Sequence, residues 1–242
     1  MKTILFVGDS WGVPNYHGPD HGPSPETHSE FLLKNLGYKV YNCSFCGGKN
    51  VDSMLAAEKF LSGEPIQLEP IGCDTSLYQP SIPTIIYEAN PKIDWIVWFH
   101  TESLRYRFDT KLTLRDNLIW GYTEEYIHAR AFFKKIGAKV AVIGGQAPIF
   151  RETFDRYIQP DFLIEDWRSE IVGRKLPESY WTTKSMWVET SNDFTVDKIK
   201  YANTSLEIFD AMKDSEDFPD NCHPGAGPHK ILSDRLHQVF QD

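Results

Sequence analysis

Four short segments rich in apolar residues constrain the fold of this chain more than any other feature. Each contains branched or aromatic side chains, and each is followed directly by a glycine or a polar residue. Such segments predict buried parallel strands, because both faces of a parallel sheet are covered and its strands need no polar alternation. The predicted strands span residues 4–7, 38–41, 93–99 and 138–143.

Amphipathic segments between these strands predict helices. The clearest span 27–36 and 116–136, each followed by a glycine suited to a helix end, and a last helix begins near Pro224. Strands that alternate with helices indicate a parallel sheet covered on both faces. The prediction is therefore an α/β fold of three layers, α/β/α, with a parallel five-stranded sheet. Less regular patterns suggest helices at 83–89, 161–172 and 197–212 and a strand at 186–189.

The length of 242 residues and the hydrophobic content of 41% suffice for one sizeable core. We therefore expect residues 1–242 to form a single domain. Irregular insertions are expected near 63–92, where prolines are dense, and near 150–215, where aromatic and charged residues mix without a clear period.

Composition and charge exclude several classes of function. A net charge of -9 argues against nucleic acid as a partner, because phosphate binding needs clustered Lys and Arg. No segment approaches the roughly 18 apolar residues that a membrane span requires. The apolar run at residues 3–7 is too short for a signal peptide. We expect a protein that is cytoplasmic, or exported without a recognisable signal peptide.

Cysteine spacing gives little support for a metal site. Without a signal peptide, the four cysteines are expected to be reduced thiols. A zinc site would need Cys43 and Cys46 together with Cys222 and His223, but the last two are adjacent, which is poor geometry for two ligands of one tetrahedral ion. We expect no metal and no organic cofactor.

Polar residues at the two ends of the sequence could form a nucleophilic site. Ser10 follows the first predicted strand, where the carboxyl ends of parallel strands place functional residues. Asp220 precedes His223 by three residues, in a proline-rich loop before the last helix. A serine becomes a useful nucleophile when a histidine takes its proton and a carboxylate orients that histidine.

These residues resemble the motifs of the SGNH (GDSL-type) hydrolases. Gly8-Asp9-Ser10 is similar to the first block of that family, and Asp220-Asn221-Cys222-His223 is similar to its last. The stretch Asn42-Cys43-Ser44-Phe45-Cys46-Gly47 is similar to the second block. The resemblance implies a flavodoxin-like fold and cleavage of a carboxylic ester. It also implies Ser10, Asp220 and His223 as the catalytic triad, with the backbone N–H groups of Ser10 and Gly47 in the oxyanion hole.

The third block departs from the family pattern. SGNH hydrolases have Gly-x-Asn-Asp there and use the Asn side chain as an oxyanion donor, whereas this chain has Phe99-His100-Thr101-Glu102. The Thr101 hydroxyl or the His100 ring are the candidate replacements. Loss of one oxyanion donor can cost about 10²- to 10³-fold in turnover, so the departure implies a changed substrate, a slower enzyme or no enzyme at all.

Candidate substrate contacts are Trp11, Glu102 and Arg105. Trp11 follows the nucleophile and could wall a pocket, although tryptophans usually pack in cores. Arg105 could bind an acidic group of the substrate or close a surface ion pair. Other histidines are assigned simpler roles, with His28 on a polar rim, His128 structural, and His229 at the surface or at a helix end.

The proposed reaction is hydrolysis of a carboxylic ester, and an O-acetyl group on a carbohydrate is the first candidate substrate. Two alternatives remain open. One is a non-hydrolytic SGNH-like module that binds glycans or has a structural role. The other is acyl transfer to a sugar by the same triad.

Overall fold

A parallel five-stranded sheet forms the centre of the molecule. The computed structural model describes residues 1–13, 25–44, 49–64, 91–101, 111–145, 147–176, 210–212, 216–218 and 223–241. The strands are β1 (Thr3–Gly8), β2 (Lys39–Asn42), β3 (Trp95–His100), β4 (Lys139–Gly144) and β5 (Phe162–Ile164). Their order is β2-β1-β3-β4-β5, and each neighbouring pair is parallel. This is the strand order of flavodoxin-like folds, so the predicted fold class is confirmed.

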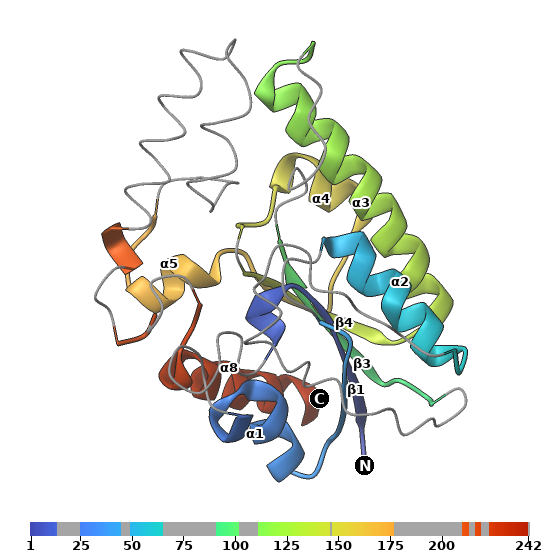
Figure 1. Cartoon of the computed structure of the whole chain (residues 1–242), viewed down its shortest axis with the longest axis vertical. Helices are drawn as coiled ribbons and strands as arrows, with labels where there is room; N and C mark the ends of the chain where they lie inside the picture. The colour runs from blue at the N-terminus through green and yellow to red at the C-terminus, as the bar shows by residue number, and fades with distance from the viewer. Residues whose placement is uncertain are drawn as a thin grey trace, which may run out of the picture.

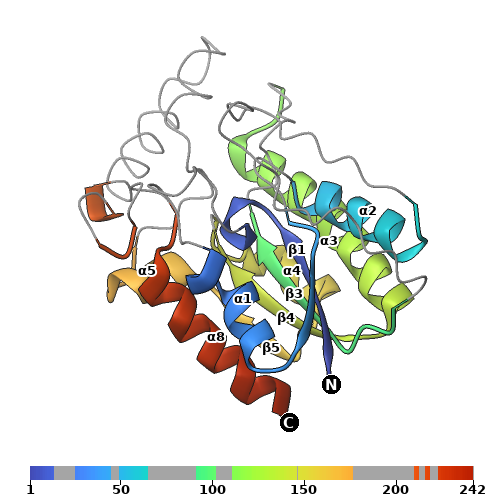
Figure 2. The ribbon, with the colours of Figure 1, turned by 60° about the horizontal axis from the view of Figure 1, so that its bottom comes forward.

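Helices cover both faces of this sheet (Figures 1 and 2). One face carries α2 (Asn50–Leu61), α3 (Leu114–Ile136) and α4 (Arg151–Tyr157), and the other carries α1 (Ser29–Asn35), α5 (Trp167–Val172) and α8 (Ala226–Gln241). The strand β3 is buried along its whole length. Its side chains alternate, since Ile96 and Trp98 pack with α2 and α3, whereas Val97 and Phe99 pack with α1 and α8.

Local capping explains where several helices begin and end. Thr113 begins α3 by accepting a hydrogen bond from the Asp116 N–H, and Gly137 ends it with a φ of 72°. Asp166 caps α5 through the Ser169 N–H. The predicted helices at 27–36 and 116–136 therefore match α1 and α3 closely, and the last helix begins two residues after Pro224.

One predicted helix is wrong. The sequence suggested a single helix over 161–172, but the structure has β5, a capping turn and then α5 in this segment. The three residues of β5 pair with Ala141–Ile143 of β4, and a strand this short shows no period that separates it from a helix. The helices α2 and α4 were not predicted. The predicted elements at 83–89 and 186–189, and most of 197–212, lie outside the described residues.

Candidate active site

Ser10 lies at the carboxyl edge of the sheet, just beyond β1. The strand ends at Gly8, and Ser10 begins a short 3-10 turn, η1 (Ser10–Gly12). Asp9 caps this turn, because its Oδ1 atom accepts a hydrogen bond from the Trp11 N–H at 3.0 Å. The backbone at the nucleophile candidate is thus held by β1 before it and by the cap of η1.

His223 reaches Ser10 from the other end of the sequence. Its Nε2 atom lies 2.8 Å from the Ser10 Oγ atom, although the two residues are 213 positions apart. The residue sits three positions before α8, in a turn where the Gly225 N–H donates to the Asp217 carbonyl at 2.7 Å. Ser10 is 4% exposed and His223 is 5% exposed. This is the geometry that proton transfer from a serine to an imidazole requires.

Several predicted site residues lie outside the described part of the chain. They are Asp220, Gly47, Glu102 and Arg105. Their roles as the orienting carboxylate, an oxyanion donor and two substrate contacts stay predictions.

The His100 ring is turned toward α3. It stacks on Tyr122 at a centroid distance of 5.3 Å, its Nε2 atom lies 3.0 Å from the Tyr126 hydroxyl, and its Nδ1 atom lies 3.4 Å from the Ala147 carbonyl. A carbonyl can only accept, so these partners assign the ring proton to Nδ1 and leave Nε2 to accept from Tyr126. The only N–H of the ring is then directed at Ala147, which favours Thr101 over His100 as an oxyanion donor.

This orientation of His100 follows from the strand that carries it. Alternate residues of β3 face the same side, so His100 shares its side with Ile96 and Trp98, next to α2 and α3. Because side chains alternate along any strand, the predicted strand at 93–99 was the signal in the sequence that could have placed His100 on the side of Ile96 and Trp98.

Thr101 is fully buried and lies directly after β3. Its N–H donates to the Asn50 Oδ1 atom at 3.0 Å, and its carbonyl accepts from the Asn50 Nδ2 atom at 2.9 Å. The neighbouring strands pair Gly8 with Phe99, so Ser10 and Thr101 both lie two residues beyond this pair. Both residues therefore follow neighbouring strands at the same edge of the sheet.

Trp11 packs inside the molecule. Its ring is 1% exposed and lies 5.7 Å from the ring of Trp167 and 6.2 Å from that of Phe218, measured between centroids. A Cβ atom on Gly145 would lie 3.5 Å from the indole, so Trp11 also reaches the end of β4. The ring thus joins the loop of Ser10 to α5 and to β4.

Two histidines near this site, His28 and His229, are buried. The prediction that His28 lies on a polar rim is wrong, whereas His229 lies at a helix end, in the first turn of α8, but with its ring buried. The two rings pack together at a centroid distance of 4.2 Å. The His229 Nδ1 atom lies 3.3 Å from the Ser29 hydroxyl. His229 shares a helical face with Leu232 and Leu236, at spacings of three and seven residues, and that face of α8 packs on the sheet and α1.

Burial keeps these imidazoles neutral. It lowers the pKa of His28 from 6.5 to about 3, and it does the same to His100. The pKa of His229 also lies well below 6.5, because of burial first and then of the nearby His28 and His223. A neutral ring suits His28, whose Nδ1 atom caps α1 by accepting from the Glu30 N–H at 3.2 Å.

The free energy of unfolding should therefore fall as the pH falls from 7 to 5. Below pH 6.5 the unfolded chain binds protons at His28 and His100, whereas the folded chain does not until about pH 3. Each such histidine contributes a loss approaching about 1.4 kcal/mol per pH unit in this window. Urea unfolding at pH 7, 6 and 5 measures the slope.

The variant His28→Asn provides the control for this pH dependence. Asparagine can still cap α1, but it does not titrate. The slope between pH 6 and 5 should be shallower in the variant than in the wild type. Equal slopes, or an unfolding free energy that does not change with pH, would contradict the assignment of His28 as a buried neutral ring.

Cys43 is a buried thiol without a disulfide. Burial raises its pKa to about 12, with a further contribution from Glu30. Within the described ranges no three His, Cys, Asp or Glu side chains are grouped as metal ligands. Of the four residues that a zinc site would need, Cys43 and His223 are described, whereas Cys46 and Cys222 lie outside the described ranges.

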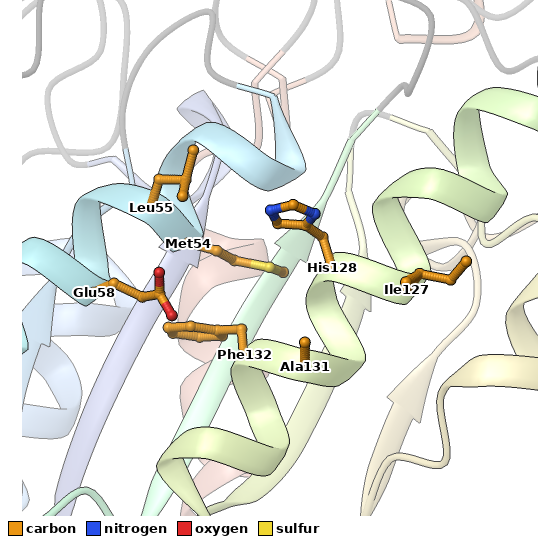
Figure 3. Close-up of a pocket in the computed structure, with 7 residues that line it drawn as sticks. All are labelled: Met54, Leu55, Glu58, Ile127, His128, Ala131 and Phe132. Carbon is orange, nitrogen blue, oxygen red and sulfur yellow. The ribbon is translucent and has the colours of Figure 1, made fainter.

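A separate hollow of about 150 Å³ lies between α2 and α3 (Figure 3). Its lining consists of Met54, Leu55, Glu58, Ile127, His128, Ala131 and Phe132. None of these residues belongs to β1, η1 or α8, so the hollow is distinct from the Ser10–His223 pair.

In the described part of the chain, no helix combines the length and apolarity of a membrane span.

The fold and the site together define the class: an α/β protein with a serine–histidine pair at the carboxyl edge of a parallel sheet. No protein-family model matches the sequence, and no curated protein matches it.

Solved structures do resemble the fold. The psychrotrophic esterase EstA from Pseudoalteromonas sp. is 12% identical at a TM-score of 0.48, with 100% of this chain and 97% of that chain covered. A protein described as an SGNH hydrolase from Slackia heliotrinireducens is 11% identical at a TM-score of 0.41, with 99% of this chain and 98% of that chain covered. A variant of an acetyl xylan esterase from Geobacillus stearothermophilus is 12% identical at a TM-score of 0.38, with 98% of this chain and 94% of that chain covered. At this identity, the similarity concerns the fold.

Proposed function

We propose that this protein is a serine hydrolase that cleaves a carboxylic ester. The observation that carries the proposal is the 2.8 Å approach of the His223 Nε2 atom to the Ser10 Oγ atom at the carboxyl edge of the sheet. A buried serine–histidine pair can have a purely structural role. Two features favour catalysis, namely the position of Ser10 at the edge where α/β folds place their sites and the resemblance of its surroundings to SGNH motifs.

In the proposed reaction, Ser10 Oγ attacks the acyl carbon while His223 Nε2 takes the hydroxyl proton. Because Nε2 accepts this proton, Nδ1 carries the other ring proton, and Asp220 is proposed to accept a hydrogen bond from it. His223 then protonates the departing alkoxide. A water molecule, deprotonated by His223, releases the acid from Ser10 and restores the starting state.

The negative charge on the tetrahedral intermediate needs hydrogen-bond donors. We assign this role to the backbone N–H groups of Ser10 and Gly47 and to the Thr101 hydroxyl. His100 is left out, because its N–H is directed at the Ala147 carbonyl. The Thr101 hydroxyl takes the place that the family gives to an asparagine side chain.

An O-acetyl group on a carbohydrate is the proposed substrate within the class of esters. Residues 150–215 contain several tryptophans and tyrosines. The ring of such a side chain can stack on the C–H groups of a sugar, and its N–H or O–H group can bind a sugar hydroxyl. Trp11 and Trp167 are not assigned to this role, because their rings are packed inside the molecule.

A serine-reactive fluorophosphonate probe tests the proposal directly. The folded protein should be labelled on Ser10, and it should hydrolyse short acyl esters and acetylated sugars, with His223→Ala as the inactive control. A folded protein that binds glycans but shows neither labelling nor hydrolysis would instead be a non-hydrolytic binding module. Product that appears only when a sugar acceptor is added would indicate acyl transfer.

A further inference from the structure

The side chain of Asn50, at the start of α2, makes four hydrogen bonds in the interior. Its Oδ1 atom accepts from the Trp98 Nε1 atom at 3.0 Å and from the Thr101 N–H at 3.0 Å. Its Nδ2 atom donates to the Thr101 carbonyl at 2.9 Å and to the Glu125 Oε2 atom at 2.7 Å. A carboxamide has two donor hydrogens and two acceptor positions, so every one is used.

Asn50 connects the loops on which the oxyanion hole is proposed to be built. It lies three residues after Gly47, and it binds both backbone groups of Thr101, as a neighbouring strand would. Thr101 is the first residue after β3, so this pairing fixes where the chain leaves the sheet. The N–H of Thr101 donates to Asn50, so it is not assigned to the oxyanion hole, and the hydroxyl is the group of Thr101 that we assign to it.

Glu125 determines which way the carboxamide faces. Its carboxylate accepts but cannot donate, so it holds Nδ2 toward α3 and leaves Oδ1 for the two N–H donors. An aspartate at position 50 would have the same size, but it would set an oxygen against the Glu125 carboxylate and the Thr101 carbonyl. The site therefore distinguishes asparagine from aspartate by hydrogen bonding alone.

We propose that Asn50 is a positioning residue of the active site, which holds Thr101 where its hydroxyl meets the oxyanion, with Glu125 fixing the orientation of Asn50. This inference rests on the proposed hydrolase function. Asn50 itself is not assigned to the oxyanion hole, because both of its N–H bonds already have partners in the protein.

The variant Asn50→Asp tests the role on an ester that the wild type hydrolyses. We expect kcat to fall about 10- to 100-fold with KM changed less than about threefold, because misplacing one oxyanion donor weakens binding of the transition state more than that of the ester. Glu125→Gln keeps the size of the side chain but can also donate, so it should lower kcat in the same direction by a smaller factor. If Asn50→Asp does not fold, the Glu125→Gln variant still tests the proposal.

Ser53→Ala is the matched control. Ser53 lies in the same turn of α2 and is buried, and its hydroxyl donates to the Asn50 carbonyl at 3.0 Å rather than to the Asn50 side chain. Thermal unfolding should show that Ser53→Ala loses stability, as the Asn50 variant does, whereas kcat stays within about twofold of the wild type, since no oxyanion donor is displaced.

The outcomes separate this inference from the proposed function. If the wild type is neither labelled by a fluorophosphonate nor active on any ester, the hydrolase proposal fails first. If the wild type is active and Glu125→Gln and folded Asn50→Asp keep its kcat, the positioning role is wrong. A loss of kcat in Ser53→Ala equal to that in the Asn50 and Glu125 variants would also overturn it, because the effect would then follow stability alone.

Discussion

Replacing Ser10 by alanine should abolish fluorophosphonate labelling and lower kcat for an ester substrate by about 10⁴- to 10⁶-fold. The reason is that Ser10 Oγ is the atom that forms the acyl bond under the proposed mechanism, and it lies 2.8 Å from the His223 Nε2 atom that would take its proton. The variant should remain folded, because alanine removes one buried oxygen and adds no bulk. Turnover of a chromogenic acyl ester at saturating concentration measures the loss, and thermal unfolding checks the fold.

His223→Ala should cause a loss of similar size, and the double variant should be no slower than either single one. Groups that act as a unit give effects that do not add. If the losses multiplied in the double variant, Ser10 and His223 would act independently, which their 2.8 Å contact does not predict. Substantial turnover in folded Ser10→Ala would place the nucleophile elsewhere.

Replacing Gly8 by alanine should lower the free energy of unfolding by about 2 to 6 kcal/mol, because backbone strain and overpacking each contribute about 1 to 3 kcal/mol. Gly8 has a φ of 139°, a conformation that suits glycine, and an added Cβ atom would lie 2.3 Å from the Phe99 carbonyl oxygen. That oxygen belongs to the central strand β3, which cannot shift without disturbing the sheet. Urea unfolding measures the loss, which is a large part of the stability of a typical domain.

Gly137→Ala separates the two causes of that loss. Gly137 also has a positive φ, 72°, but an added Cβ atom there would meet nothing within 4 Å. Only the conformational cost of about 1 to 2 kcal/mol should remain. If both variants lost the same stability, close approach of the strands β1 and β3 at Gly8 would not be the cause.

The central strands could be predicted because they are buried on both faces. The predictions at 4–7 and 138–143 differ from β1 (Thr3–Gly8) and β4 (Lys139–Gly144) by one residue at each end. β5 escaped prediction, because three apolar residues between two charged segments fit a helix equally well until β4 is present as a partner.

The site was predictable only in part, for a related reason. The motif around Ser10 and the loop of His223 can each be read locally, and the structure brings the two side chains together. The hydrogen bonds of Asn50 cannot be read in this way, since its partners lie 48, 51 and 75 residues away, at Trp98, Thr101 and Glu125. Which polar residues become buried depends on how α2, α3 and β3 pack.

The separation of 213 positions between Ser10 and His223 has a consequence for biosynthesis. During translation Ser10 leaves the ribosome first, and His223 follows only after the strands β1 to β5 have been made. An unfinished polypeptide therefore carries a hydroxyl without its base. Under the proposed mechanism, ester cleavage in a translation reaction would begin only after the whole sheet has been made. Truncated chains that end before His223 would not cleave the ester.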